Sequence, residues 1–387
     1  MPSAKILCIV GARPNFMKIA PILRAFRARA PGLDVKLVHT GQHYDVAMNE
    51  QFFAQLGIPT ADISLEVGSA SHAVQTAEIM RRFEPVIDAE QPQAVLVLGD
   101  VNSTIACALV AAKKNVKVVH VEAGLRSRDR TMPEELNRLL TDQLSDRLYV
   151  TEREAIANLL AEGIGAERIV FAGNVMIDTL RACQAQAVAA SETIARFCPV
   201  GANPDSIVAR AAATFLENPA GYALLTMHRP SNVDAVTVLA PLLAALEDIS
   251  QDLPLVFPMH PRTLAKIREA GLAAFLDNPR VLVLPPIGYF EMLGLMREAR
   301  LVLTDSGGLQ EETTALGIPC LTLRENTERP ITITQGSNTL VGTQPNAIRL
   351  AVAEVLRTGG KAGRQPELWD GHAAERIVDD LAAWLGG

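Results

Sequence analysis

Short apolar runs rich in Val, Ile and Leu recur along the chain, and this repetition limits the possible folds more than any other feature. Each run is followed by a turn that contains Gly or Asp, and then by a longer amphipathic stretch. Such alternation is typical of βα units, whose parallel strands are buried on both faces and so appear as continuous hydrophobic runs. The sequence therefore predicts an α/β fold built on parallel sheets.

The apolar runs fall into two groups, and we expect each group to form one sheet. In the first half the predicted strands are Lys5–Val10, Val35–Thr40, Ala94–Leu98, Val116–Val121, Arg147–Thr151 and Ile169–Ala172. In the second half they are Tyr222–Met227, Leu255–Met259, Val281–Leu284, Leu301–Thr304 and Pro319–Leu323. The amphipathic stretches between them predict helices, for example over Ser71–Asp88 and Ser103–Lys113.

The length of the chain, 387 residues, suits two domains better than one. The least regular stretch runs from about Ala185 to Asp205 and is punctuated by Pro and Gly. We therefore predict two doubly wound Rossmann-like domains, over residues 1–185 and 206–365, with a ligand in the interdomain cleft. The tail over residues 366–387 carries both tryptophans and is predicted to form a helix that packs back on the first domain.

Composition and charge narrow the possible partners and location. A formal net charge of -7 argues against non-specific nucleic-acid binding, which needs a basic face. No apolar run approaches the roughly 20 residues that span a bilayer, and the first strand begins at once, without a signal peptide. The five cysteines show no CxxC pair and no metal spacing, which fits a reducing compartment. We expect a cytoplasmic protein with neither nucleic acid nor membrane as a partner.

The turn after the first strand combines glycine with two cations. Gly11 allows a tight turn, and the helix that comes next offers its N-terminus, Arg13 and Lys18 to an anion. A plain βα turn with two solvated cations remains the alternative. The turn lacks the GxGxxG pattern, so dinucleotide binding is not indicated.

Three carboxylates follow strands or open a helix in the first half. Asp100 comes after Ala94–Leu98, Glu122 comes after Val116–Val121, and Glu134 stands just behind Pro133. Asp100 could instead cap a helix, and Glu134 could serve only the first helical turn. Ligands of open α/β sheets bind at the carboxyl ends of the strands, so the three acids are expected to face one cleft. Several acids around one site suit proton transfer at carbon.

Polar residues follow the strands of the second half as well. His228, beside Arg229, is placed to bind phosphate or to stabilise a leaving group, and His260 repeats the pattern one strand later. Neither histidine has a metal-like spacing, so no metal site is predicted. Ser306, Gly307 and Gly308 open a helix and offer N–H groups to a diphosphate, and Glu312 is one turn further on. A capped helix with acids in its first turn is the alternative.

At these residues the sequence resembles the non-hydrolysing UDP-N-acetylglucosamine 2-epimerases. Ten motifs run in order from Gly11 to Thr343: GARPNFMKIAP, HTGQHYD, LGDVNST, HVEAGLRS, MPEELNR, TMHRPSNVD, PMHP, TDSGGLQEE, RENTERP and GSNTLVGT. The resemblance implies a fold of the glycosyltransferase B type with UDP in the interdomain cleft, bound by the C-terminal domain. It implies interconversion of UDP-N-acetylglucosamine and UDP-N-acetylmannosamine for polysaccharide synthesis, by a homodimer without a cofactor or metal.

The resemblance also implies a mechanism and roles for individual residues. UDP leaves carbon 1 as carbon 2 loses its proton, giving a glycal, and UDP adds back while the proton is delivered to the other face. The implied acid/base groups are Asp100, Glu122 and Glu134, and His228 steadies the leaving diphosphate. The implied substrate-binding residues are Arg13, Lys18, Arg138, Phe290 (against uracil), Ser306, Gly307, Gly308, Glu312 (on the ribose) and Arg329.

Some positions depart from the family pattern. Pro230 and Ser231 stand where many members carry a Glu before Asn, and Ile331 follows TERP where many carry another Glu. Gln42, His43 and His260 correspond to a site where some bacterial members bind a second substrate molecule as an activator, but Tyr44 and Asp45 replace a more basic pattern. Four alternatives therefore stay open: a modified sugar such as a diacetamido uronic acid, a glycosyltransferase, a hydrolysing 2-epimerase, and a UDP-sugar sensor without turnover.

Overall fold

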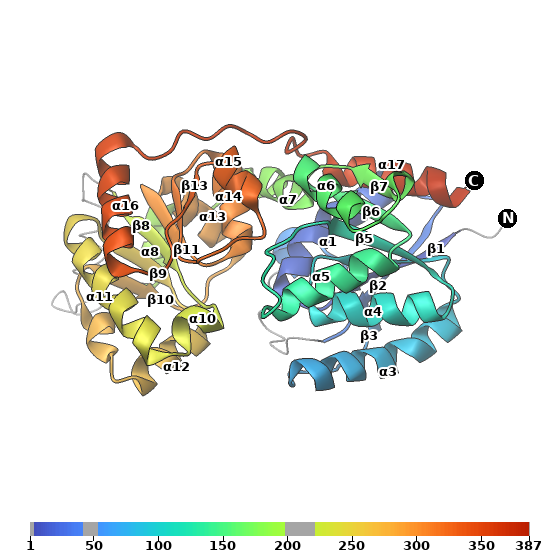
Figure 1. Cartoon of the computed structure of the whole chain (residues 1–387), viewed down its shortest axis with the longest axis horizontal. Coiled ribbons are helices and arrows are strands. Elements are labelled where there is room, and N and C mark those ends of the chain that lie inside the picture. The colour runs from blue at the N-terminus through green and yellow to red at the C-terminus, as the bar shows by residue number, and fades with distance from the viewer. Residues whose placement is uncertain (1–3, 42–52, 198–220, 387) are drawn as a thin grey trace. The chain divides into compact units, whose positions relative to one another are not determined.

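The computed structural model describes residues 4–41, 53–197 and 221–386 (Figure 1). The chain divides into two compact units. Unit 1 consists of Met1–Ala182 together with Glu367–Gly387, and unit 2 consists of Cys183–Pro366.

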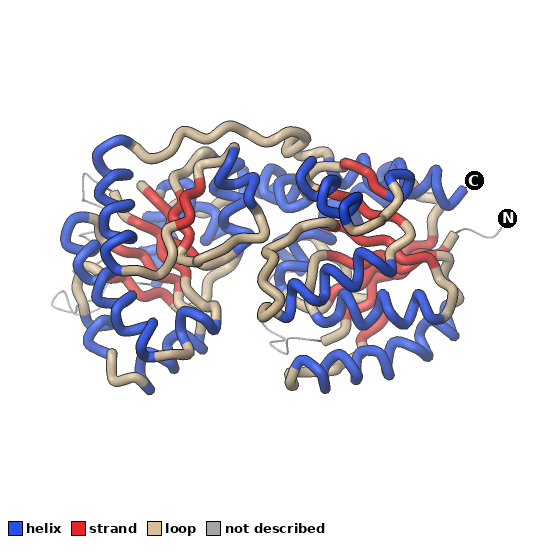
Figure 2. Tube along the Cα trace, viewed as in Figure 1, coloured by secondary structure: helices blue, strands red, loops and turns tan. Residues whose placement is uncertain are grey.

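Unit 1 is built on a parallel sheet with the strand order β3-β2-β1-β4-β5-β6-β7. Its strands form the interior of the unit, with helices around them (Figure 2). The order reverses direction between β1 and β4, as in doubly wound Rossmann-like folds. The strands are β1 (Lys5–Val10), β2 (Asp34–His39), β3 (Ile63–Ser64), β4 (Ala94–Leu98), β5 (Lys117–Ala123), β6 (Arg147–Val150) and β7 (Ile169–Phe171).

The helices of unit 1 bury one face against this sheet. Ser71 begins α3 by accepting a hydrogen bond from Val74 N, 3.4 Å away, and fully buried Ile79 and Phe83 point from that helix into the core. The helices are α1 (Arg13–Arg29), α3 (His72–Glu90), α4 (Asn102–Lys113), α5 (Pro133–Leu144), α6 (Arg153–Ala161), α7 (Val175–Cys183), α17 (Ala373–Gly386) and the 3₁₀ turn Ala166–Arg168.

The C-terminal helix α17 packs against α1 within unit 1 (Figure 1). Asp178 of α7 accepts hydrogen bonds from Ala373 N and Ala374 N, at 3.2 and 2.7 Å, and so satisfies the first turn of α17. Further along, the hydroxyl of buried Tyr149 donates to Asp380, 2.8 Å away. The tail is thus fixed at both its start and its second half.

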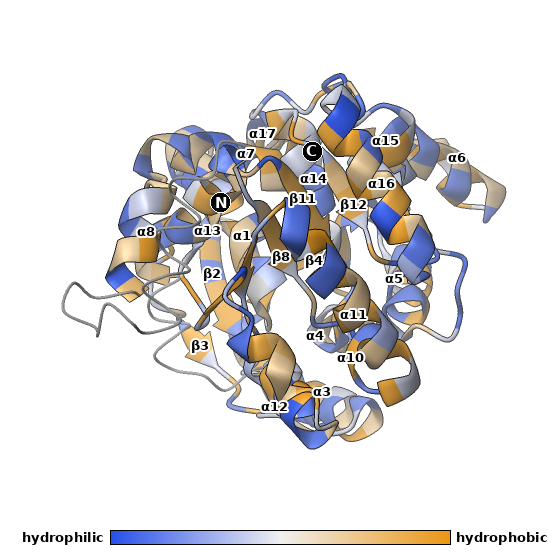
Figure 3. Cartoon of the chain, turned by 90° about the vertical axis from the view of Figure 1, so that its left-hand side faces the viewer, coloured by the Kyte–Doolittle hydropathy of each residue, from blue (hydrophilic) through white to orange (hydrophobic). Residues whose placement is uncertain are grey.

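Unit 2 repeats the architecture with the parallel order β10-β9-β8-β11-β12-β13. Its strands are mostly hydrophobic, whereas several of its helices carry one apolar and one polar side (Figure 3). The strands are β8 (Ala223–Thr226), β9 (Leu255–Pro258), β10 (Val281–Leu284), β11 (Leu301–Thr304), β12 (Cys320–Thr322) and β13 (Asn338–Leu340). The helices are α8 (Ala190–Phe197), α10 (Pro230–Val233), α11 (Val236–Asp252), α12 (Pro261–Glu269), α13 (Tyr289–Glu298), α14 (Gly307–Leu316), α15 (Pro330–Thr334), α16 (Pro345–Thr358) and the 3₁₀ turns Gln184–Gln186 and Ala273–Asp277.

The α/β fold class predicted from the sequence is confirmed. Four strands have the predicted bounds, and the others differ by one or two residues at an end. Strands β3 and β13 were not predicted, because each is short and polar in part. Part of the stretch predicted to be irregular forms α8, and the tail helix begins at Ala373 instead of residue 366. None of the helices in the described residues is long and apolar enough to cross a membrane.

Candidate active site

The carboxyl ends of β1, β4 and β5 lie side by side on one edge of the unit 1 sheet. Asn15, at the start of α1, ties two of these ends together. Its Oδ1 accepts hydrogen bonds from Gly11 N and Ala12 N, at 3.1 and 3.2 Å, and its Nδ2 donates to Leu98 O, 3.0 Å away. No role was predicted for Asn15, and its position after the first strand was the only available signal.

Lys18 and Glu122 form a buried ion pair at this edge. Lys18 Nζ lies 2.6 Å from Glu122 Oε1, and the two residues are 4% and 3% exposed. The pair adjoins Gly99, which has a φ of 63°, and a Cβ there would come within 2.8 Å of the ammonium. Lys18 was expected to face a bound anion, but its ammonium is bound to the carboxylate of Glu122.

Glu122 lies inside β5 and not after it, which corrects the sequence prediction. The strand continues to Ala123, with a register shift against β6 between Val121 and Ala123. Glu122 occupies this irregularity with a φ of 72°, a region that residues other than glycine seldom adopt. Bulges of this kind redirect a side chain, and strained backbone is concentrated at functional sites. The sequence pattern carries no signal of such a bulge.

Asp100 is held by a cation from α5. Arg138 Nη2 lies 2.6 Å from Asp100 Oδ2, while the other end of the same guanidinium contacts Glu135. Asp100 is partly accessible, whereas Glu135 is buried and also accepts hydrogen bonds from Ser127. Burial alone would raise the pKa of Glu135, but these bonds and the Arg138 charge hold it below its ordinary value. Glu135 is therefore a fixed anion, which leaves Asp100 as the accessible carboxylate of the group.

Among the other residues predicted in unit 1, the structure describes the side chain of Glu134 alone. Glu134 is half-exposed in the first turn of α5, and among the described residues its carboxylate has no such partner. Arg13 begins α1, but its side chain lies outside the described part of the chain. Gln42 and His43 also lie outside the described residues.

Buried His120 contacts the backbone at the carboxyl end of β4. His120 Nδ1 is 2.7 Å from Asp142 Oδ1, and its Nε2 is 2.8 Å from Gly99 O. Both neighbours are acceptors, because Asp142 also receives Gly124 N and Arg126 at its other oxygen. The Gly99 carbonyl can only accept, so Nε2 donates to it. His120 fixes the carbonyl of Gly99, directly before Asp100, and no role was predicted for it.

In unit 2 the corresponding edge presents His228. Its imidazole is half-exposed, and its Nδ1 lies 3.2 Å from the buried carboxylate of Asp305. The same carboxylate accepts hydrogen bonds from His228 N and Arg229 N, which fixes the turn after β8 against the end of β11. His228 was predicted, but Asp305 was not.

Ser306, Gly307 and Gly308 lie at the N-terminus of α14, as predicted, and arginines surround the turn. A Cβ on Gly307 would come within 2.6 Å of Glu328 Oε1 and 2.9 Å of Arg329 Nη1, so a larger residue would displace these two side chains. Burial favours a neutral Glu328, but the charges of Arg329, Arg324 and Arg229 hold its pKa well below the ordinary value. Arg329 also contacts Glu311, with its Nε 2.9 Å from Glu311 Oε1. Amide groups at a helix N-terminus beside guanidinium groups are suited to an anion.

Glu312 is buried and accepts a hydrogen bond from Tyr289 Oη, 2.7 Å from its Oε1. Burial raises the pKa of Glu312 to about 7, although the Tyr289 bond opposes that shift. Phe290, the predicted uracil contact, follows on α13 and is half-buried. His260 caps α12, with its Nδ1 accepting from Arg262 N, 3.2 Å away, and is exposed.

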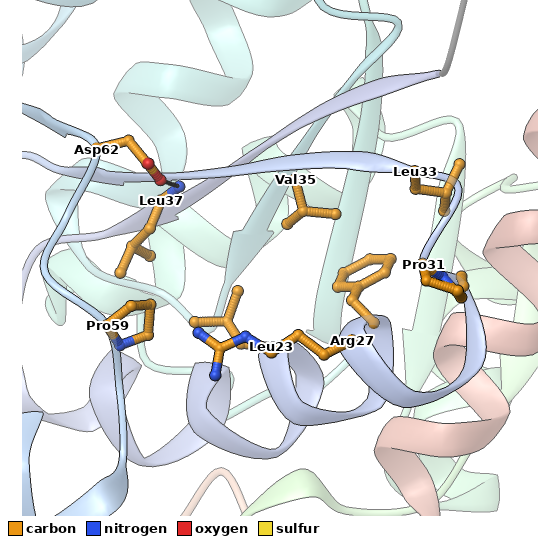
Figure 4. Close-up of a pocket in the computed structure, with 10 residues that line it drawn as sticks. Leu23, Arg27, Pro31, Leu33, Val35, Leu37, Pro59 and Asp62 are labelled. Carbon is orange, nitrogen blue, oxygen red and sulfur yellow. Dashed lines mark hydrogen bonds between the residues drawn. The ribbon is translucent and has the colours of Figure 1, made fainter.

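A separate pocket of about 290 Å³ lies along α1 and β2 in unit 1 (Figure 4). Leu23, Val35 and Leu37 give it apolar walls, and Asp62 beside it accepts a hydrogen bond from Leu37 N. It lies along residues 33–37, away from the carboxyl ends of the strands, so it is distinct from the candidate site. No group of three metal-binding side chains occurs among the described residues.

Two Rossmann-like units, one with paired carboxylates and one with a glycine turn suited to an anion, have the architecture of the glycosyltransferase B class. The family model described as UDP-N-acetylglucosamine 2-epimerase matches residues 25–382. The chain belongs to this family.

Individual relatives agree with this assignment. The chain is 40% identical over 378 residues to a UDP-N-acetylglucosamine 2-epimerase of Methanococcus maripaludis, covering 97% of each chain. It is also 40% identical over 384 residues to a UDP-2,3-diacetamido-2,3-dideoxy-D-glucuronate 2-epimerase of Pseudomonas aeruginosa, covering 98% of this chain and 99% of the relative. The crystal structure of the Methanocaldococcus jannaschii UDP-GlcNAc 2-epimerase with UDP-GlcNAc and UDP matches with a TM-score of 0.84 and 37% identity, covering 98% of this chain and 99% of that one.

Proposed function

We propose that the chain reversibly epimerises carbon 2 of UDP-N-acetylglucosamine to give UDP-N-acetylmannosamine. The observation that carries this proposal is the buried ion pair of Lys18 and Glu122, close to Asp100. These residues lie at the edge formed by the carboxyl ends of β1, β4 and β5. Removal of a weakly acidic proton from carbon needs a base that is positioned and shielded from water. Glu122 meets that need, because it is 3% exposed and its bulged backbone aims it at Lys18.

The reaction proceeds by elimination and re-addition. A carboxylate takes the proton from carbon 2, a double bond forms between carbons 1 and 2, and the carbon 1–oxygen bond breaks with its electron pair going to UDP. UDP then adds back to carbon 1 while a proton is delivered to the opposite face of carbon 2. Two acid/base groups are required, and we assign them to Asp100 and Glu122, with Glu134 as a third candidate.

Residues of unit 2 bind the nucleotide in this proposal. His228 stabilises the departing diphosphate, and the Ser306–Gly308 turn binds it through N–H groups at the N-terminus of α14. Glu312 accepts hydrogen bonds from the ribose, and Phe290 packs on uracil. Arg329 already contacts two carboxylates, so we assign it to the charge balance of the turn together with Arg324.

In unit 1 the cations act on the acids as well as on the substrate. Lys18 is the counter-ion of Glu122, and Arg138 is the counter-ion of Asp100, because each lies 2.6 Å from its carboxylate. Arg13 completes the proposed substrate contacts, and Gln42, His43 and His260 form the proposed activator site.

The proposal is tested by starting from each sugar separately. UDP-N-acetylglucosamine and UDP-N-acetylmannosamine should converge on the same mixture, followed by proton NMR. With ¹⁸O in the bridging position at carbon 1, the label should scramble into the other oxygens of the β-phosphate, because UDP becomes free to rotate. Conversion without scrambling would exclude elimination of UDP. Release of free N-acetylmannosamine would indicate hydrolysis, and transfer to an added acceptor would indicate a glycosyltransferase.

A second substrate is favoured by one specific observation. The Pseudomonas aeruginosa diacetamido glucuronate epimerase and the Methanococcus maripaludis enzyme share the same 40% identity with this chain. The departures at Pro230, Ser231 and Ile331 also stand next to residues of the proposed site. Parallel kcat/KM measurements on the two UDP sugars separate the candidates, and the larger value identifies the substrate.

The proposed function includes an oligomeric state and a cellular location. We expect a homodimer that acts in the cytoplasm and supplies polysaccharide synthesis. The four described cysteines, which are Cys8, Cys107, Cys183 and Cys320, are buried free thiols, as suits a reducing compartment. Light scattering on the purified protein tests the dimer, and a mass of one chain would exclude it.

A further inference from the structure

Four nitrogen atoms lie within 3.2 Å of the carboxylate of Asp305. It directly follows β11, and none of its side chain is exposed. Its carboxylate accepts from His228 N at 3.0 Å, Arg229 N at 2.9 Å and Asn232 Nδ2 at 3.2 Å. The imidazole nitrogen His228 Nδ1 is a further neighbour, 3.2 Å from Oδ1. A buried carboxylate surrounded in this way is a fixed hydrogen-bond acceptor.

This approach bears on which hydrogen the His228 ring carries. A carboxylate can only accept, so the 3.2 Å separation favours the form of the ring with hydrogen on Nδ1. Nε2 is then the nitrogen left to act on a ligand, on a ring that is 46% exposed. Carboxylates that bind one nitrogen of a histidine in this way fix the ring and its tautomer in other active sites.

The same carboxylate also fixes the backbone that carries the ring. Its bonds to His228 N and Arg229 N connect the turn after β8 to the residue just before Ser306. The ring and the start of the anion-binding turn therefore share one point of attachment. A rotation of the ring away from the turn would separate Nδ1 from Oδ1 and leave His228 N as the remaining donor to that oxygen.

We propose that Asp305 is a positioning residue for His228, holding the ring with hydrogen on Nδ1 and Nε2 directed at the leaving diphosphate. The inference rests on the proposed function, because it assigns His228 the diphosphate of a UDP sugar. Once Nε2 is protonated, it donates to a phosphate oxygen, and the negative charge of Asp305 offsets the positive charge of the ring. The competing explanation is that Asp305 holds the turn and does not act on the ring.

The tautomer is tested directly on the wild-type protein, without any turnover. The chain has seven histidines, so ¹⁵N-histidine labelling gives a small set of signals, and His228→Gln identifies one of them by its loss. We expect the neutral His228 ring to carry its hydrogen on Nδ1. A neutral ring with its hydrogen on Nε2 would overturn the proposal, whatever reaction the protein catalyses.

A double-mutant cycle then separates action through the ring from a separate structural role. Asp305→Asn should lower kcat by about 100-fold, close to the loss in His228→Gln, while UDP affinity changes much less. In the His228→Gln background, Asp305→Asn should cost less than about threefold, because the ring it positions is gone. Equal losses in both backgrounds would show that Asp305 does not act through His228.

Asp248→Asn provides the matched control. Asp248 lies on α11 with a side chain that is 62% exposed and pairs with Arg349 at the surface. Removal of such a pair changes stability little, and its kcat should equal that of the wild type. If Asp305→Asn does not fold, the NMR experiment still decides. If the wild-type protein converts no UDP sugar, the proposed function fails, and the tautomer is still measured independently.

Discussion

The two units share a strand order but differ in the side chains placed at the ends of their strands. On the unit 1 edge two of the candidate carboxylates are paired with cations, as Glu122–Lys18 and Asp100–Arg138. On the unit 2 edge a glycine turn stands beside three arginines, which contact the buried carboxylates of Glu311 and Glu328. One edge is suited to handling protons and the other to binding an anion. The comparison shows that the scaffold sets where a site lies, while strand-end residues set its chemistry.

Neutralising Glu122 should have the largest effect, and only on the chemical step. Glu122→Gln removes the base and leaves the unit 2 edge unchanged, so kcat should fall by about 10³-fold or more while UDP affinity is retained. Steady-state kinetics and UDP calorimetry measure the two quantities. Glu84→Gln, at an exposed pair with Lys114, is the control and should behave as wild type. Near-normal turnover in Glu122→Gln would break the division of roles between the units.

Glu312 should make unit 2 more sensitive to pH than unit 1. Its pKa is about 7 in the folded protein, against 4.5 ordinarily, so the folded state binds its proton more tightly. Its stabilising contribution is complete below pH 4.5 and is lost as pH rises through 7, by about 3 kcal/mol in the free energy of unfolding. Urea unfolding at about pH 5 and about pH 8 brackets the folded pKa and measures this change.

Glu312→Gln supplies the control for that pH dependence. Gln cannot ionise in this range but keeps an oxygen that can accept from Tyr289. The difference in free energy of unfolding between the two pH values should therefore shrink by most of the wild-type contribution. The same pH dependence in both proteins would show that another group is responsible.

A methyl group on the unit 2 turn should impair binding more than chemistry. In Gly307→Ala the new Cβ meets Glu328 and Arg329, which must move and disturb the N–H groups of the turn. Loss of about 2 kcal/mol of charge-assisted hydrogen bonding would weaken UDP binding by roughly 30-fold. Calorimetry with UDP measures this loss of affinity. Gly359 is not a suitable control position, because its φ of 88° would strain an alanine. Gly32→Ala, where a Cβ meets nothing within 4 Å, should bind UDP normally.

The smallest effect should come from the C-terminal tail, which belongs to unit 1 alone. Asp380→Ala leaves the hydroxyl of buried Tyr149 without its acceptor and should lower the free energy of unfolding of unit 1 by about 1–3 kcal/mol. Thermal unfolding monitored by hydrogen exchange measures the stability of each unit separately. Loss of protection in unit 2 instead would contradict the assignment of the tail. Asp379→Ala, at an exposed pair with Arg29, should cost less.

Much of this comparison could be predicted from the sequence, because buried parallel strands leave continuous apolar runs and the residues after them mark the functional edge. Asp100, His228 and Glu312 were found in that way. The bulge at Glu122 could not be, since it arises from pairing between β5 and β6. The contacts of Asn15, His120 and Asp305 with the strand ends were also not predicted, because contacts between segments far apart in the chain leave no local pattern.

The most direct test of the division between the two edges is exchange of the hydrogen on carbon 2. The wild-type protein is incubated with UDP-N-acetylglucosamine in deuterium oxide, and both UDP sugars are recovered and examined by proton NMR. Proton abstraction by unit 1 predicts deuterium at carbon 2 in both sugars, and Glu122→Gln should show neither exchange nor conversion while still binding UDP. Conversion to UDP-N-acetylmannosamine without solvent deuterium, in the wild type, would contradict proton transfer through these carboxylates.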